Sequence, residues 1–249
     1  MLLALFLIDL AAGLYLFLPL VGRRNAGVKF YRLILITSGA LALCALVASR
    51  LAHATQSSVL EAIVVGLTII VYVTLRYPKR LIFRIPAALL GAVYIVAPVM
   101  AWREATHASL AWSIAGAISS VALLGSVNLA MLLGHWYLVV RGMAIDPLKR
   151  LTIATLAATI IKILVVTIAT IAIIAGGAWY EVAIRQGIFF WMHAGWGLLG
   201  PLLLYPMVWG TVKIRSTMAA TGILYVDVVA VVIGEVLGAW LSAIVHLPV

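Results

Sequence analysis

The chain has 249 residues, of which 66% are hydrophobic and 10% are charged. Soluble domains are about 45–50% apolar and about 25% charged, and a chain this short cannot enclose so much apolar surface in one core. The composition therefore excludes a soluble globular protein and predicts one whose surface faces lipid. The net charge of +10 would suit a nucleic-acid-binding protein. The cations lie in short segments between apolar runs, however, so we expect no nucleic-acid partner.

Eight apolar segments follow one another along the chain. A helix needs about 20 mainly apolar residues to cross the hydrocarbon core of a bilayer. Segments of this kind lie at 2–21, 31–50, 59–76, 83–101, 110–136, 151–175, 187–210 and 217–245. Their continuous apolar runs exclude a transmembrane β-barrel, whose strands alternate over about ten residues. The sequence predicts an all-α polytopic membrane protein, a single transmembrane helical domain of about eight helices over residues 1–249.

The positions of the cations predict the orientation of the chain. Thirteen of the 17 Lys and Arg residues follow the first, third, fifth and seventh segments: Arg23, Arg24, Lys29, Arg32, Arg76, Lys79, Arg80, Arg84, Arg141, Lys149, Arg150, Lys213 and Arg215. Short cytoplasmic loops are enriched in Lys and Arg. We therefore expect cytoplasmic basic loops, both termini outside and residence in a bacterial inner membrane.

Two ionisable residues are expected near the middle of the membrane. Such residues are costly within a span and are functional candidates for that reason. Lys162 lies about eleven residues from the cytoplasmic start of its predicted helix, and Asp227 lies about ten residues from the start of its own. We predict that the two form a buried ion pair, which serves either a proton relay or helix packing alone.

A second polar group is expected at the depth of the outer leaflet. It combines His193, Glu235 and Asp9, while Trp196 and Gly197 lie within one turn of His193. A glycine beside a histidine lets either a flat quinone ring or a neighbouring helix approach the backbone. The sequence predicts that these five residues bind a quinone headgroup or relay protons. A hydrogen-bonded structural histidine is the alternative.

Haem b is a less favoured cofactor than quinone. His135 is expected near the cytoplasmic face and His193 near the outer face, about 25 Å apart at ~1.5 Å per residue, so the two cannot share one iron. An outer haem would need His193 with one of the other outer histidines, which are His53, His107 and His246. No other metal site is predicted, and no known catalytic motif is present.

These features favour an integral membrane subunit of a respiratory-type electron-transfer complex. The subunit would contact the lipid bilayer, bind quinone or relay protons, and need other membrane or peripheral subunits as partners. It is not expected to be catalytic alone, although it fits a membrane subunit of an oxidoreductase. Two alternatives stay open: a small proton-coupled secondary transporter that uses Lys162 and Asp227, and a structural or assembly subunit without chemistry of its own.

Overall fold

The structure is a computed structural model that describes residues 1–77, 81–140, 142–177 and 179–249. Of this part of the chain, 89% is helical and none forms a strand. Eight helical segments within it are long and apolar enough to cross a membrane. The predicted all-α polytopic fold is therefore confirmed. Three of the basic-loop cations, Lys79, Arg80 and Arg141, lie outside the described residues.

The first five spans are formed by α1 (Leu2–Val21), α2 (Arg23–Leu51), α3 (Thr55–Thr74), α4 (Leu81–Thr106) and α5 (Leu110–Val139). The rest of the chain forms α6 (Asp146–Ala175), the π-helical turn η1 (Glu181–Arg185), α7 (Gly187–Met192), the π-helical segment η2 (His193–Leu199), α8 (Gly200–Lys213) and α9 (Thr217–Val245). The seventh span combines α7, η2 and α8.

Two helices begin five or more residues earlier than hydropathy predicts. α2 begins at Arg23 rather than at residue 31, and it bends at Gly27, whose φ of 78° and ψ of 171° are open essentially to glycine alone. α6 begins at Asp146 rather than at residue 151, with Pro147 in its first turn. Proline suits that position because its φ is already helical and its missing N–H has no partner to lose. Both added helical segments are rich in polar residues, so a search for apolar runs does not include them.

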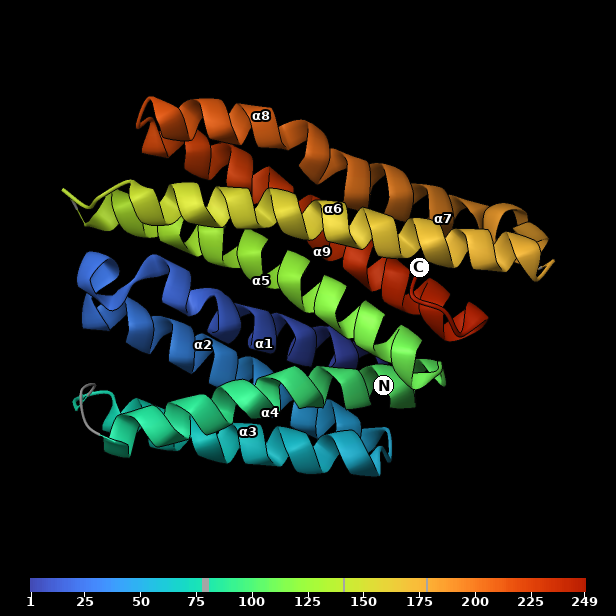
Figure 1. The fold of residues 1–249 in the computed structure, drawn as a ribbon, viewed down its shortest axis with the longest axis horizontal. Helices are drawn as coiled ribbons and strands as arrows, with labels where there is room; N and C mark the ends of the chain where they lie inside the picture. The colour runs from blue at the N-terminus through green and yellow to red at the C-terminus, as the bar shows by residue number, and fades with distance from the viewer. Residues whose placement is uncertain (78–80, 141, 178) are drawn as a thin grey trace.

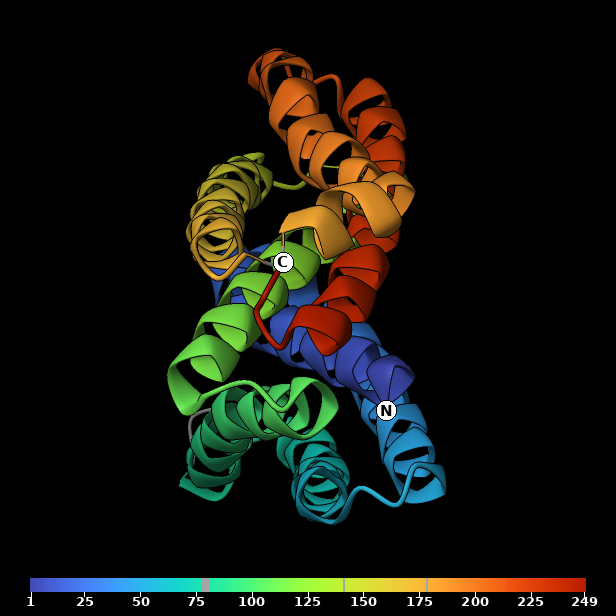
Figure 2. The same ribbon diagram turned by 90° about the vertical axis from the view of Figure 1, so that its right-hand side faces the viewer.

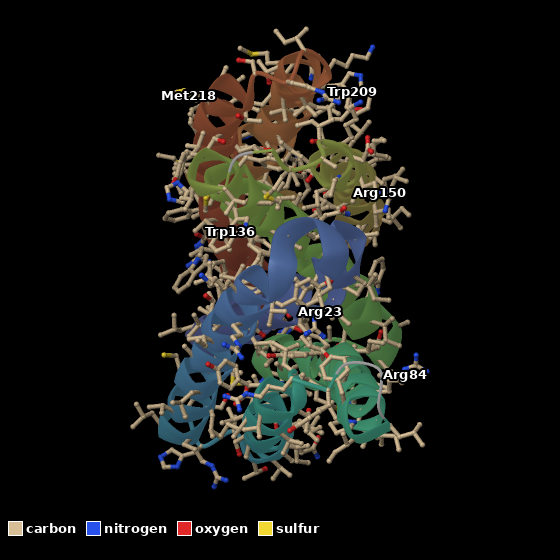
Figure 3. The ribbon with its side chains drawn as sticks, turned by 90° about the vertical axis from the view of Figure 1, so that its left-hand side faces the viewer. Arg23, Arg84, Trp136, Arg150, Trp209 and Met218 are labelled. Atoms are coloured by element: carbon tan, nitrogen blue, oxygen red, sulfur yellow. The ribbon has the colours of Figure 1, made fainter. Side chains whose placement is uncertain are left out.

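α1 and α5 lie in the middle of the bundle (Figure 1, Figure 2), and α5 is the most deeply buried of the spans. α2, α3 and α4 pack on one side of this pair, and α6 to α9 pack on the other. Both termini lie at one end of the bundle. α1, α3, α5 and α8 finish at the opposite end, which we call the cation-rich end; Arg23, Arg84 and Arg150 mark it in Figure 3.

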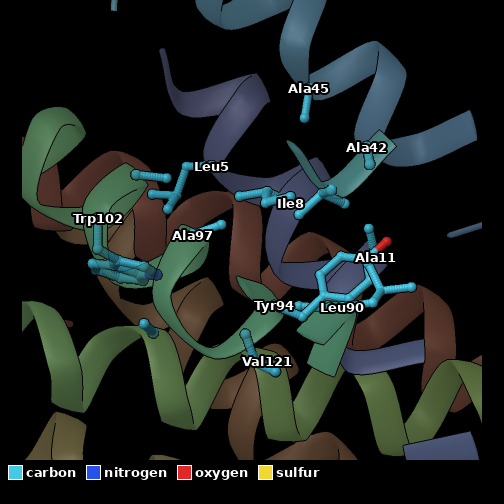
Figure 4. Close-up of a cluster of buried hydrophobic side chains, with 14 of the residues drawn as sticks. Leu5, Ile8, Ala11, Ala42, Ala45, Leu90, Tyr94, Ala97, Trp102 and Val121 are labelled. Atoms are coloured by element: carbon cyan, nitrogen blue, oxygen red, sulfur yellow. The ribbon is translucent and has the colours of Figure 1, made fainter. Parts of the chain in front are cut away.

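A cluster of buried apolar side chains joins α1, α2 and α4 (Figure 4). Small side chains such as Ala11, Ala42 and Ala45 alternate in it with larger ones such as Leu90 and Tyr94. Small residues let helices approach closely in a membrane, where association depends on packing contacts. Trp102, which is 2% exposed, belongs to the same cluster. The apolar core therefore holds this indole in place.

The two central helices touch through their backbones. A Cβ added to Gly13 of α1 would lie 2.5 Å from Cα of Gly125 in α5, and one added to Gly125 would equally overlap Gly13. Only a pair of glycines permits this approach. The crossing sets the position of α1 against α5, and with it the positions of Asp9 and Ser120 nearby in sequence.

Gly13→Ala is expected to destabilise the protein by about 1–3 kcal/mol, because the added methyl group forces the two central helices apart. Gly210→Ala is the matched control, since nothing lies within 4 Å of its Cβ position; the gain in helix propensity leaves it as stable as the parent chain or more so. The midpoint of thermal unfolding in detergent measures both changes. A Gly13→Ala variant that unfolds at the parent temperature would contradict the close crossing.

Candidate functional site

Lys162 of α6 lies at the centre of a group of polar side chains inside the bundle. It is 1% exposed, and its Nζ donates hydrogen bonds to Oε2 of Glu235 at 3.1 Å and to Oγ of Ser120 at 2.8 Å. The same Nζ lies 5.7 Å from the ring centroid of Trp102, within the range of a cation–π interaction. The ammonium is therefore tied to α4, α5 and α9 at once.

The ion pair differs from the one that the sequence predicts. Lys162 pairs with Glu235 and not with Asp227, so the expected Lys162–Asp227 pair is wrong. Because α6 begins at Asp146, Lys162 lies sixteen residues into its helix, close to the eighteen by which Glu235 follows Thr217 in α9. The earlier start places Lys162 about 7.5 Å deeper than hydropathy suggests. Asp227, ten residues into α9, stays at a shallower level.

Asp9 of α1 joins the same group through Trp102. The indole Nε1–H of Trp102 donates to Oδ2 of Asp9 at 2.8 Å, and Asp9 is 2% exposed. Asp9 also lies within electrostatic reach of Lys162 and Glu235. A Cβ at Gly116 would lie 2.8 Å from the Trp102 ring, so the glycine provides the space that the indole occupies. Trp102 thus contacts a carboxylate through its edge and an ammonium across its face.

His193 lies against α9 with one ring nitrogen engaged. It is fully buried, and its Nδ1 is 2.7 Å from the carbonyl oxygen of Gly234. A carbonyl can only accept, so Nδ1 carries the proton, and Nε2 of the neutral ring keeps a lone pair. Nε2 has no hydrogen-bond partner in the described part of the chain. The ring lies within electrostatic reach of Lys162 and Glu235, so its free nitrogen is a hydrogen-bond acceptor inside the same group.

Glycines close the space around His193. A Cβ on Gly197 would overlap the backbone of Gly234, and one on Gly238 would lie 2.8 Å from Cε1 of His193. Gly197, on which the expected quinone contact depended, therefore admits the backbone of α9. Trp196, expected beside His193 at the same site, is 52% exposed on the outside of the bundle.

Six spans contribute to one buried group, the central polar cluster, which consists of Asp9, Trp102, Ser120, Lys162, His193 and Glu235. Buried polar atoms nearly always have hydrogen-bond partners. In the described residues, however, Oε1 of Glu235 and Oδ1 of Asp9 have none, and neither has Nε2 of His193. Three proton acceptors therefore lie around one ammonium. Groups of this chemistry can hold and exchange protons.

Asp227 lines a separate small cavity on the side of the cation-rich end, which we call the Asp227 cavity. Its wall includes Thr152, Thr155 and Thr159 of α6 and Tyr205 of α8. Its volume of about 10 Å³ is on the order of the room that one water needs. Oδ1 of Asp227 and Oγ1 of Thr155 are buried and lack partners among the described residues.

The threonines of this cavity lead toward the central polar cluster. Thr152, Thr155, Thr159 and Lys162 follow one another at steps of three, four and three residues, which places them on one face of α6. All four are buried. A stripe of hydroxyls therefore connects the level of Asp227 with that of Lys162.

The seventh span widens into a π-helix at His193. The N–H of Gly200 donates to the carbonyl of Gly195, five residues back. Pro201 follows and cannot donate to the carbonyl of Gly197, which removes one ordinary helical hydrogen bond. This loss explains why the turn widens just before the proline. π-helical turns are frequent at functional sites, and here the turn carries His193 into the central polar cluster.

Three of the other histidines have contacts of their own. His135 is exposed, with its Nδ1 3.4 Å from the hydroxyl of Tyr225. His246 donates from Nδ1 to the carbonyl of Thr106 at 2.6 Å, and its ring centroid lies 6.3 Å from that of His107. The described residues include no group of three or more His, Cys, Asp or Glu side chains that could hold a metal ion. Haem binding stays a prediction from sequence.

Two members of the central polar cluster were not expected from sequence. Trp102 adjoins Arg103 near a helix end, where a tryptophan is typical of the membrane interface. Ser120 is an uncharged residue in an apolar span. The sequence feature that could have indicated Ser120 is the pair Ser119-Ser120 in the middle of α5, the most buried span. Hydroxyl groups in such a place need a hydrogen-bond partner.

Comparisons with protein-family models, with curated proteins and with solved structures find no match to this chain. What the protein does must therefore be inferred from the chemistry of its own buried side chains.

The ion pair predicts a non-additive response to mutation. Lys162→Met and Glu235→Leu should each cost about 3 kcal/mol of unfolding free energy, because either change leaves a lone charge in the bundle. The double variant should recover most of this loss, since it removes both charges and keeps similar volumes. Unfolding in mixed micelles measures the three values. Simple addition of the two single losses would show that the side chains do not interact.

Proposed function

We propose that this integral membrane protein relays protons through the central polar cluster. The observation that carries the proposal is the Lys162–Glu235 pair, joined at 3.1 Å and buried on both sides. Charged and neutral forms of such a pair come closer in energy where water is absent, because burial penalises both charges. A proton can then pass from Nζ to Oε2 along the existing hydrogen bond, which leaves a neutral amine and a neutral acid.

The groups on either side of the pair supply an entry and an exit. On the side of the cation-rich end, Asp227 with one water and the hydroxyls of Thr155 and Thr159 would deliver a proton toward Lys162. Beyond the pair, Oδ1 of Asp9 and Nε2 of His193 are acceptors without present partners in the described chain. The relay needs no large cavity, since protons move along hydrogen bonds and single waters.

Close packing favours proton relay over quinone binding at His193. The ring is fully buried, and the backbone of Gly234 in α9 occupies the space beside Gly197 that a quinone was expected to enter. The electron-transfer complex that the sequence favours stays a prediction, and it would supply the energy that drives protons through the chain.

One observation supports the secondary transporter as a second candidate. The π-helical break at η2 lies beside buried charges, and interrupted helices at mid-membrane sites are typical of transporters. A proton-coupled transporter would move protons only together with a solute. Proton flux measured without any solute therefore separates the two candidates.

Vesicles that contain the purified protein and an internal pH dye should acidify when a potassium diffusion potential drives protons inward. The double variant Lys162→Met/Glu235→Leu, which keeps its fold but lacks the pair, should slow this flux about 100-fold or more, the scale of a lost acid–base group. Asp146→Asn is the control, because Asp146 is exposed at the start of α6. A parent protein that conducts no better than empty vesicles, or a double variant that conducts equally well, would refute the relay.

We propose further that the cation-rich end faces the cytoplasm of a bacterial cell and that both termini face outward. Cys44 is the one cysteine of the chain, so a Cys44→Ser background permits single-cysteine labelling. A thiol reagent that cannot cross membranes should label Ser109→Cys in intact spheroplasts and should label Ser216→Cys only after lysis. The reverse pattern would invert the orientation.

A further inference from the structure

An apolar cavity of about 420 Å³ lies between α1, α2, α3 and α4. Its lining includes Tyr15, Pro19, Tyr31, Leu75, Phe83 and Gly91. A volume of this size is typical of sites for small molecules. The cavity is separate from the central polar cluster, since the two share no residue.

We propose that this cavity binds an acyl chain of an anionic phospholipid, whose phosphate is held by Arg23. Pro19 and Ala88, on α1 and α4, line the cavity and are exposed. The cavity therefore opens on the surface of the bundle, where the lipid is, and a chain can enter it sideways from the bilayer.

The polar groups of the cavity wall are already engaged. The hydroxyl of Tyr15 donates to the carbonyl of Ala87 at 2.8 Å, and that of Tyr31 donates to the carbonyl of Leu18 at 3.2 Å. A quinone headgroup would need donors for its two carbonyl oxygens, and these hydroxyls are occupied. The remaining surface is hydrocarbon, which suits an acyl chain.

Arg23 supplies the charge at the end of the cavity. Its Nη2 donates to the carbonyl of Leu75 at 3.0 Å, and Leu75 lines the cavity. Its Nη1 is buried and has no hydrogen-bond partner in the part of the chain that the structure describes. A guanidinium with free N–H groups is well suited to a phosphate, which it can bind through two parallel hydrogen bonds.

The depth of Arg23 matches that of lipid phosphates. α1 ends at Val21, so Arg23 follows the end of the span by two residues. Pro19 and Leu16, which line the cavity, lie about 6 and 10 Å further into the membrane at 1.5 Å per residue. Figure 3 shows Arg23 at the cation-rich end, between α1 and α2 on one side and α3 and α4 on the other. A lipid there can place its phosphate and its chain together.

The other cations of this end favour a headgroup with net negative charge over a zwitterionic one. Basic residues near a membrane surface each attract anionic lipid by about 1 kcal/mol, and Arg84 and Arg150 lie at the same end of the bundle. We therefore expect phosphatidylglycerol to bind more tightly than phosphatidylcholine with the same chains.

Native mass spectrometry of the full chain in detergent, with either lipid added at equal concentration, tests the site. Phosphatidylglycerol should remain bound preferentially, and Arg23→Gln should weaken its binding about fivefold, which corresponds to about 1 kcal/mol. Arg150→Gln is the matched control: it removes an exposed cation at the same end, away from the cavity lining, and should weaken binding less than Arg23→Gln does. Equal retention of the two lipids, or equal losses in both variants, would overturn the proposal.

A second pair of variants tests the cavity without changing charge. A Cβ at Gly91 would meet Cε1 of Tyr15 at 3.8 Å, so Gly91→Leu places its side chain in the cavity and should reduce lipid binding at least as much as Arg23→Gln. Gly210→Leu, with nothing within 4 Å of its Cβ position, should bind as the parent does. Unchanged binding by Gly91→Leu, or preferential retention of an added quinone, would contradict the assignment.

Discussion

An ammonium and a carboxylate cannot remain charged in a lipid-embedded bundle unless they meet, and the arrangement of the second half of this protein follows from that requirement. Lys162 and Glu235 come from α6 and α9, which are not adjacent in sequence, and each is almost fully buried. The cost of removing two charges from water is several kcal/mol for each ion. Ser120 and Trp102 recover part of it through a hydrogen bond and a ring face.

Glycine contacts set the geometry of the pair. Where Gly13 meets Gly125 and Gly197 meets Gly234, helices approach to backbone contact. In water, burial of apolar side chains would drive such contacts. In lipid that driving force is absent, so the helices associate through packing contacts and hydrogen bonds. The carbonyl of Gly234 accepts from His193, so one small residue both admits the neighbouring helix and orients the imidazole beside Glu235.

Sequence reasoning recovered the eight spans because apolar length is a direct consequence of bilayer thickness. It recovered Lys162, Glu235, His193 and Asp9 as buried ionisable residues for the same reason. It paired Lys162 wrongly because the polar first turn of α6 carries no hydropathy signal, and an error of five residues shifts the depth by about 7.5 Å. Trp102 could not be assigned to the group, since its contact with Asp9 joins residues 93 positions apart and depends on how α1 crosses α4.

The order of the helices has a consequence for how the chain is assembled. Asp9 enters the membrane with α1, but its indole partner arrives only with α4. Lys162 enters with α6, when Ser120 is already present, and meets its carboxylate only when the last span, α9, is inserted. During synthesis Lys162 therefore lacks its ion-pair partner until α9 is in place. Docking of α9 is the step that supplies the carboxylate, so a chain truncated before α9 would keep Lys162 in the bundle without its partner.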